Sequence, residues 1–88
     1  MPEISRFYGL VIKLLYSDDD KRHKPHVHVK YGEYKASVGF DGEILAGQIP
    51  VKQYRILVAW LVIHEEELYR AWNLAVAGKP FDKIDPLS

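Results

Sequence analysis

The sequence predicts an α+β fold, in which an antiparallel meander of about four strands is followed by one long helix or two consecutive helices. Residues 1–48 form a β-rich half, because short apolar or alternating runs are separated there by turn residues. Residues 49–78 form a helical half, because apolar residues recur there at spacings of three and four. The chain of 88 residues has room for a single domain, and residues 79–88 make a C-terminal tail.

The first predicted strand runs from Phe7 to Tyr16 and is rich in aromatic and branched apolar residues. Both alternation phases of this run are largely apolar, which indicates a central strand covered on both faces. The next stretch, residues 17–25, is the most polar part of the chain. It is predicted to be a solvated loop, and it contains His23.

The clearest predicted hairpin joins strands at His26–Tyr31 and Tyr34–Phe40 through a two-residue turn at Gly32-Glu33. Because side chains alternate along a strand, Val27 and Val29 are expected to face the core with Tyr31, while the histidines and Lys30 face solvent. The cross-strand pairs predicted are Tyr31 with Tyr34, Lys30 with Lys35, Val29 with Ala36, His28 with Ser37, Val27 with Val38 and His26 with Gly39.

A second hairpin is expected at Asp41-Gly42, a favoured type I′ pair, and leads into a short strand from Glu43 to Ala46. The helical half then begins at Pro50, which suits a first helical position, and ends at Gly78 and Pro80. One apolar stripe runs along this half and comprises Leu57, Leu61, His64, Leu68, Ala71 and Ala75.

The helical half is longer than a compact domain of this size can cover if it forms a single helix. A single helix of this length would measure about 42 Å at ~1.5 Å per residue, whereas a compact domain of this size has a radius of gyration of about 12 Å. The helix therefore either overhangs and meets a partner subunit, or breaks, with Glu65, Glu66 and Glu67 suited to the first turn of a second helix. The continuous stripe favours one helix, and it predicts a homo-oligomer formed through the helical half.

Composition narrows the function classes. Lys plus Arg equals Asp plus Glu at 12 each, so the basic excess typical of DNA-binding proteins is missing. The absence of cysteine excludes disulfides and thiolate metal sites. The N-terminus has no signal-peptide pattern, and the longest apolar run, Ile56 to Ile63, is far shorter than the ~20 residues of a membrane span. These features predict a cytoplasmic protein without membrane contact.

The residues that point to chemistry cluster on the first hairpin. His26 and His28 lie two residues apart on one strand, so their imidazoles share a face, as a catalytic acid/base pair requires. Lys30, Lys35 and Ser37 add a basic and hydroxylic strip that can hold RNA backbone while a histidine acts as acid or base. These residues predict a metal-independent site without a cofactor.

Two other interpretations of the cluster stay open. His23 is a further binding residue on the adjoining loop, and with its neighbouring aspartates it could complete a metal site. Two strand histidines without a fixed third ligand are a weak metal signal, so no metal site is predicted. The cluster is also consistent with an ordinary polar sheet face, on which paired lysines protect a hairpin end.

Several stretches of the sequence resemble a bacterial family known only as domain of unknown function 4160. The resemblance covers nearly the whole chain, and it implies a small prokaryotic protein, often encoded beside a second small protein and suspected of belonging to toxin–antitoxin-like gene pairs. It points to His23, His26 and His28 as characteristic positions and assigns them no role. The matching residues are Met1-Pro2-Glu3-Ile4-Ser5-Arg6-Phe7-Tyr8-Gly9, His23-Lys24-Pro25-His26-Val27-His28, Tyr31-Gly32-Glu33-Tyr34, Gly42-Glu43-Ile44-Leu45, and the helix from Trp60 to Trp72 that ends at Gly78-Lys79-Pro80.

Three functional hypotheses follow from the residues and the resemblance together. The first is a component of a toxin–antitoxin-like gene pair that acts through protein–protein contact, with the protein encoded by the adjacent gene as its partner. The second is a small metal-independent RNA-acting enzyme that uses His26 and His28. The third is a small metal-binding domain.

Overall fold

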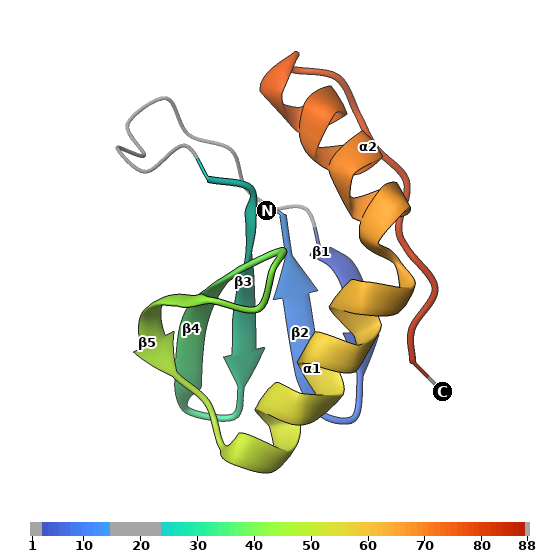
Figure 1. The fold of residues 1–88 in the computed structure, drawn as a ribbon. Coiled ribbons are helices and arrows are strands. Elements are labelled where there is room, and N and C mark those ends of the chain that lie inside the picture. The colour runs from blue at the N-terminus through green and yellow to red at the C-terminus, as the bar shows by residue number, and fades with distance from the viewer. Residues whose placement is uncertain (1–2, 15–23, 88) are drawn as a thin grey trace.

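The computed structural model describes residues 3–14 and 24–87 of the chain. They form an antiparallel five-stranded sheet in meander order, β1-β2-β3-β4-β5, followed by two helices (Figure 1). The predicted α+β class is confirmed, with one strand more than expected. The elements are β1 (Glu3–Phe7), β2 (Leu10–Lys13), β3 (His26–Tyr31), β4 (Tyr34–Gly39), β5 (Ile44–Gln48), α1 (Val51–Ile63) and α2 (Glu65–Val76).

The extra strand comes from a turn inside the apolar run that was predicted to be a single strand from Phe7 to Tyr16. Tyr8 and Gly9 have φ angles of 48° and 80°, which is the positive pair that a type I′ turn requires. The turn pairs Phe7 of β1 with Leu10 of β2. A side chain at Gly9 would lie 2.8 Å from Cε1 of Tyr31, so this position has no room for a Cβ. The prediction of one long strand is therefore wrong.

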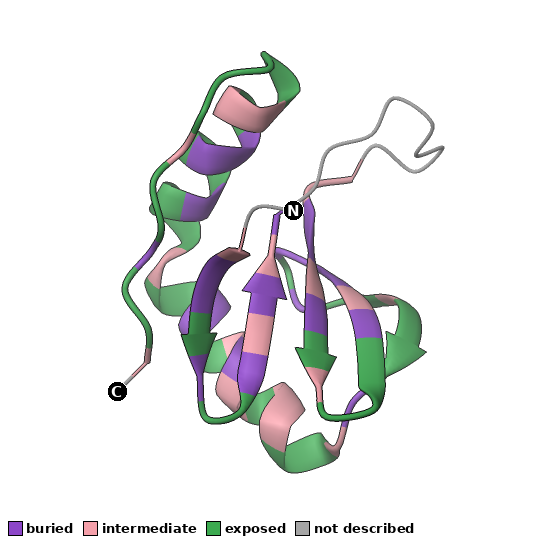
Figure 2. Ribbon diagram, turned by 180° about the vertical axis from the view of Figure 1, so that it is seen from behind, coloured by how far each residue is buried: buried purple, intermediate pink, exposed green. Residues whose placement is uncertain are grey.

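β2 is also covered on one face only, contrary to the prediction. Leu10 and Ile12 are buried, while Val11 and Lys13 alternate with them and are half-buried. Figure 1 shows α1 lying across one face of the sheet. The Trp60 ring of α1 packs 5.3 Å from the Phe7 ring of β1. Figure 2 shows the opposite face, which α1 does not cover.

The predicted register of the β3–β4 hairpin is confirmed at all six pairs, from Tyr31 opposite Tyr34 to His26 opposite Gly39. Gly32 has a φ of 57° at the first turn position, where a type II′ turn takes glycine. The second hairpin differs from the prediction in its turn. Gly42 has a φ of 91°, but Asp41 has no positive φ, so the turn is not type I′. The following strand covers Ile44–Gln48 instead of Glu43 to Ala46.

The helical half is broken at His64, whose backbone has φ −107° and ψ 23°. An unbroken helix from Val51 to Val76 would be about 39 Å long at ~1.5 Å per residue, longer than the largest extent of the molecule, 33 Å. The break lets one chain bury the apolar stripe, including Leu57 and Leu68. The expectation of one helix is wrong, and the alternative of two helices is confirmed. The stripe that predicts a homo-oligomer is largely covered within the chain. The oligomeric state itself stays a prediction.

The helical half begins and ends near the residues that the sequence predicts, and only its start differs, by one residue. Pro50 precedes α1 as its capping residue instead of opening the helix. Gly78 has a φ of 72° and its N–H donates to the carbonyl of Ala75, which ends α2 where the sequence predicts.

The tail returns along the two helices to the edge of the sheet (Figure 1). The backbone N–H of Ile84 donates to the Ile4 carbonyl of β1 at 2.8 Å, and Nε1 of Trp60 donates to the Asp85 carbonyl at 2.8 Å. Ile84 is buried and Phe81 packs against the core, so these two side chains anchor the tail. In the described part of the chain, neither helix has the length and apolar character that a bilayer crossing demands.

Candidate functional site

The uncovered face of the sheet carries the candidate site, because strand pairing arranges its side chains in two transverse rows. Alternation places Lys13, His28 and Ser37 on this face, opposite the face that α1 covers. Lys30 and Lys35 lie on the same face, two residues after His28 on β3 and two residues before Ser37 on β4. The first row reads Glu3, Lys13, His28, Ser37 and Ala46, and the second reads Arg6, Val11, Lys30, Lys35 and Gln48, each from β1 to β5.

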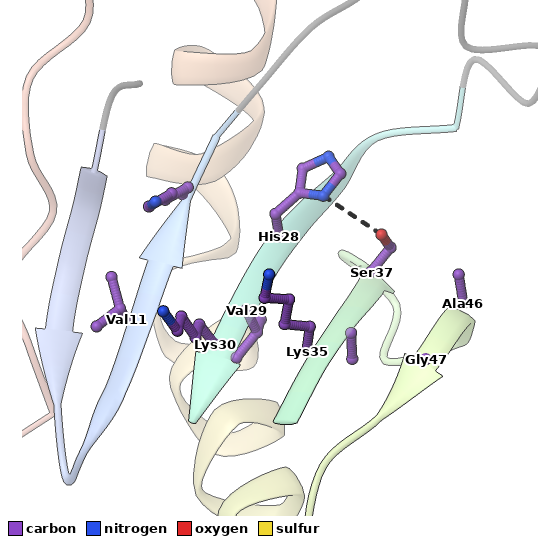
Figure 3. A pocket seen from close by; sticks show the side chains of 10 residues that line it. Val11, His28, Val29, Lys30, Lys35, Ser37, Ala46 and Gly47 are labelled. Carbon is purple, nitrogen blue, oxygen red and sulfur yellow. Dashed lines mark hydrogen bonds between the residues drawn. The ribbon is translucent and has the colours of Figure 1, made fainter. Parts of the chain in front are cut away.

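The middle of both rows lines an open hollow of about 420 Å³, whereas Glu3 and Arg6 at the β1 end and Gln48 at the β5 end lie outside its lining. Figure 3 shows His28, Lys30 and Lys35 standing on the side of the sheet that faces away from the helices. Lys13, Lys30 and Lys35 give the hollow three positive charges, and its described lining contains no carboxylate. Paired residues on adjacent antiparallel strands lie about 5 Å apart at Cα, so Lys30 and Lys35 present neighbouring ammonium groups.

At the β1 end of the rows the charge is compensated. The Arg6 guanidinium donates to the Glu3 carboxylate at 2.7 Å, and Lys83 lies 3.9 Å from the same carboxylate. The hydrogen bond from Arg6 holds the pKa of Glu3 below its ordinary value. Lys13 also lies close enough to Glu3 to help lower its pKa, whereas Lys30 and Lys35 carry exposed positive charge over β3 and β4.

His28 lines the hollow and is half-buried. Its Nδ1 lies 3.4 Å from Oγ of Ser37 on the paired strand, at the long end of hydrogen-bond distances (Figure 3). An imidazole and a hydroxyl both donate and accept hydrogen bonds, so they can contact a phosphate oxygen beside the lysine charges.

His26 departs from the prediction that both strand histidines are exposed to solvent, because only 4% of its surface is accessible. It occupies the first position of β3, and its ring lies 5.4 Å from Trp72 of α2 and 5.1 Å from His28. Its Nδ1 lies 2.6 Å from the carbonyl oxygen of Lys24, which can only accept, so Nδ1 carries the proton. The burial comes from α2, which packs against this end of β3 and which alternation along the strand does not reveal.

His23, the third predicted binding residue on this side, lies outside the described residues. Within residues 3–14 and 24–87, no three histidine, aspartate or glutamate side chains converge as a metal site requires. His26 and His28 are close to each other, but the described residues supply no third ligand beside them. The metal-binding hypothesis therefore has no ligand set in the described structure.

His64 and Lys24 serve the fold. His64 Nδ1 lies 2.8 Å from Glu67 Oε1, and its ring packs 5.5 Å from Trp60 at the break between the helices. The Lys24 ammonium bridges Asp41 at 2.8 Å and Glu43 at 3.1 Å, which ties the segment before β3 to the β4–β5 turn.

Sequence reasoning found Lys30, Lys35, Ser37 and His28 but missed Lys13. The reason is the undetected turn at Tyr8-Gly9, since a single strand from Phe7 to Tyr16 gave no partner or face for Lys13. The glycine within an apolar run was the one available signal, because it often marks a turn or a close backbone approach.

The sequence profile of one protein family, "Domain of unknown function (DUF4160)", matches residues 9–73. The chain belongs to this family, and the match includes the strands that carry the cationic hollow as well as the break between the helices. No curated protein and no solved structure matches the chain significantly. The description of the family names no activity, so the function has to be argued from the geometry.

Proposed function

We propose that this protein binds single-stranded RNA through the uncovered face of its sheet, as one component of a toxin–antitoxin-like gene pair. The observation that supports RNA binding is the hollow itself, in which three lysines stand beside His28 and Ser37 without a described carboxylate. Lysine ammonium groups bind phosphate as mobile point charges, and they suit a backbone whose geometry varies.

The shape and chemistry of the face favour contacts to the RNA backbone over contacts to bases. Sheet faces that read bases do so with exposed aromatic side chains on which the bases stack. The described lining here has no Phe, Tyr or Trp. The RNA is therefore bound through its phosphates and 2′-hydroxyls, with weak sequence preference.

RNA cleavage is a further step that the same face would support through one histidine. His28 is the half-buried imidazole that lines the hollow, and imidazole is the side chain most often used as a general acid or base. His26 would act only by holding His28 in place, since it is buried against Trp72. Cleavage of a labelled RNA in the presence of EDTA, abolished by His28→Gln, would support this role; uncleaved RNA that stays bound restricts the function to binding.

Binding is tested by fluorescence anisotropy with a labelled oligouridine of about 12 nucleotides, a length that covers a typical single-strand site. Each phosphate contact on a single strand contributes about −0.7 to the slope of log K against log salt, so three lysines predict a slope of about −2.1. Lys30→Ala with Lys35→Ala should reduce the slope to about −0.7.

The matched control removes two exposed lysines outside the hollow, Lys79→Ala with Lys83→Ala. Wild type and control should lose roughly 20-fold in affinity between about 50 and 200 mM salt, and the Lys30/Lys35 variant roughly 3-fold. The proposal fails if wild type does not bind the oligonucleotide, or if the two double variants weaken binding equally.

The second candidate is contact with the protein encoded by the adjacent gene, and the exposed edge of the sheet favours it. β5 is the last strand in the sheet order, and four of its five residues are exposed, with Leu45 half-buried. A partner segment can add to such an edge as an extra strand through backbone hydrogen bonds. Co-expression and pull-down test this, with Ala46→Pro as the variant that disrupts strand addition.

A further inference from the structure

The outward side of α1 carries a continuous exposed seam that the RNA-binding proposal does not use. Lys52, Arg55, Ala59 and Val62 recur at spacings of three and four and are all exposed, together with Ile63. Leu57, Trp60 and Leu61 form the buried side of the same helix, against the sheet. Val62 and Ile63 are 67% and 62% exposed, so apolar surface is presented to solvent at the C-terminal end of the seam.

The charge along this seam changes sign from one end to the other. Lys52 and Arg55 give its N-terminal end a charge of +2. At the other end, Val62 and Ile63 border a hollow of about 370 Å³ whose rim carries Glu65, Glu66, Glu67 and Arg70. Three glutamates and one arginine give that rim a charge of −2, equal and opposite to the N-terminal end.

We infer that two copies of this chain associate through this seam, with their α1 helices antiparallel about a two-fold axis near Ala59. Lys52 lies at the N-terminal end of α1 and the acidic rim borders Val62 and Ile63 at its C-terminal end, so the antiparallel arrangement brings the basic end of one copy to the acidic rim of the other. A two-fold axis repeats this contact, since an isologous interface is self-complementary. A parallel arrangement would set the glutamates of the two copies against each other.

The packing at the centre of the seam suits a close approach of two helices. Ala59 is exposed and small, so it lets the two backbones come near at the axis. Val62 and Ile63 follow Ala59 by three and four residues, so they would cover their exposed surface against Ile56 and the aliphatic part of Arg55 on the other copy. Because α1 covers the opposite side of the sheet, both cationic hollows of the dimer would face outward.

The size of the seam sets the strength of the association. A helix of 13 residues is about 20 Å long and about 10 Å wide, so the contact is well below the ~800 Å² per partner of a standard interface. The dimer is therefore expected to be reversible, with a Kd of about 10 μM to 1 mM. Its charged ends make it weaker at high salt.

Sedimentation equilibrium with paired charge reversals tests the arrangement. Lys52→Glu with Arg55→Glu should make the protein monomeric, and so should Glu65→Lys with Glu66→Lys, because each change sets like charges against each other. An equimolar mixture of the two variants should form a heterodimer at least as well as wild type, since both contacts become attractive again. Lys30→Glu with Lys35→Glu, the matched reversal on the sheet face, should leave the dimer unchanged.

The inference is overturned if wild type stays monomeric at about 500 μM, a concentration at which a dimer of the expected strength is substantially populated. It is equally overturned if the charge reversals leave association unchanged, if the mixture fails to restore it, or if the protein forms open-ended polymers. RNA binding by the dimerisation variants separates the two proposals, because they retain all three lysines of the hollow.

Discussion

Truncating His26 to alanine is expected to destabilise the fold far more than truncating His28, although the two residues are neighbours on one face of β3. His26 is 4% exposed, its Nδ1 donates to the Lys24 carbonyl at 2.6 Å, and its ring packs 5.4 Å from Trp72. The lost hydrogen bond is worth about 1 kcal/mol, and the ring contact adds about 0.5–1.5 kcal/mol. With the cavity left behind, the variant should lose about 2–3 kcal/mol of unfolding free energy.

His28 has a half-buried ring, and its hydrogen bond to Ser37 is long at 3.4 Å, so its removal should change stability by less than about 1 kcal/mol. At about 4–8 °C per kcal/mol for a domain of this size, His26→Ala should lower Tm by about 10–20 °C and His28→Ala by less than about 8 °C. Val29→Ala, at a buried core position of the same strand, should lose about 1–3 kcal/mol.

Thermal unfolding followed by circular dichroism at neutral pH measures the three variants against wild type. Equal melting temperatures for the two histidine variants would refute the argument that α2 buries His26. A larger loss for His28→Ala than for Val29→Ala would refute the register of the whole hairpin.

Two further predictions concern the β4–β5 region. Gly47→Ala should disrupt β5, because the new Cβ would lie 2.1 Å from the Lys35 carbonyl oxygen at a φ of 73°. Gly32→Ala, at a φ of 57° with nothing within 4 Å, should lower the free energy of unfolding by only about 1 kcal/mol. The amide chemical shifts of β5 should change in the Gly47 variant and stay as in wild type in the Gly32 variant. The hydrogen bond from Lys24 lowers the pKa of Asp41 from its ordinary 3.8, so the stability this contact supplies is present above that value and is lost as the pH falls through the lower folded pKa. Lys24→Met should therefore flatten the acid limb of a plot of Tm against pH, and an unchanged limb would contradict the contact.

The β3–β4 hairpin could be predicted in full because its signals are local. A glycine at the turn sets the register, and alternation of valine with histidine and lysine fixes which side faces the core. The same alternation identified His28, Lys30 and Lys35 as members of one face, which the structure confirms as the lining of one hollow.

The sequence predictions fail where a local pattern is consistent with two structures, or where residues distant in the sequence come into contact. Tyrosine is rarely found at positive φ, so Tyr8-Gly9 gives little sign of a turn, and the sequence predicts one strand from Phe7 to Tyr16 with no strand before it. His26 looked exposed because alternation describes a strand in isolation, whereas Trp72 approaches from a helix 46 positions later in the sequence. The break at His64 has no glycine or proline to mark it, and only the three following glutamates indicated it.

The equal numbers of basic and acidic residues bear directly on the prediction of function. Net charge averages over the whole surface, and its value of zero disfavoured a nucleic-acid binder. The fold separates the charges: three lysines meet in the hollow of the sheet, while Glu65, Glu66 and Glu67 gather at the break between the helices. At physiological salt, exposed charges are screened beyond about 8 Å, so a ligand on one face responds to the local charge and not to the sum. A neutral chain can therefore present a phosphate-binding surface and an oppositely charged contact surface at once, and charge-reversal variants on the two faces should act independently.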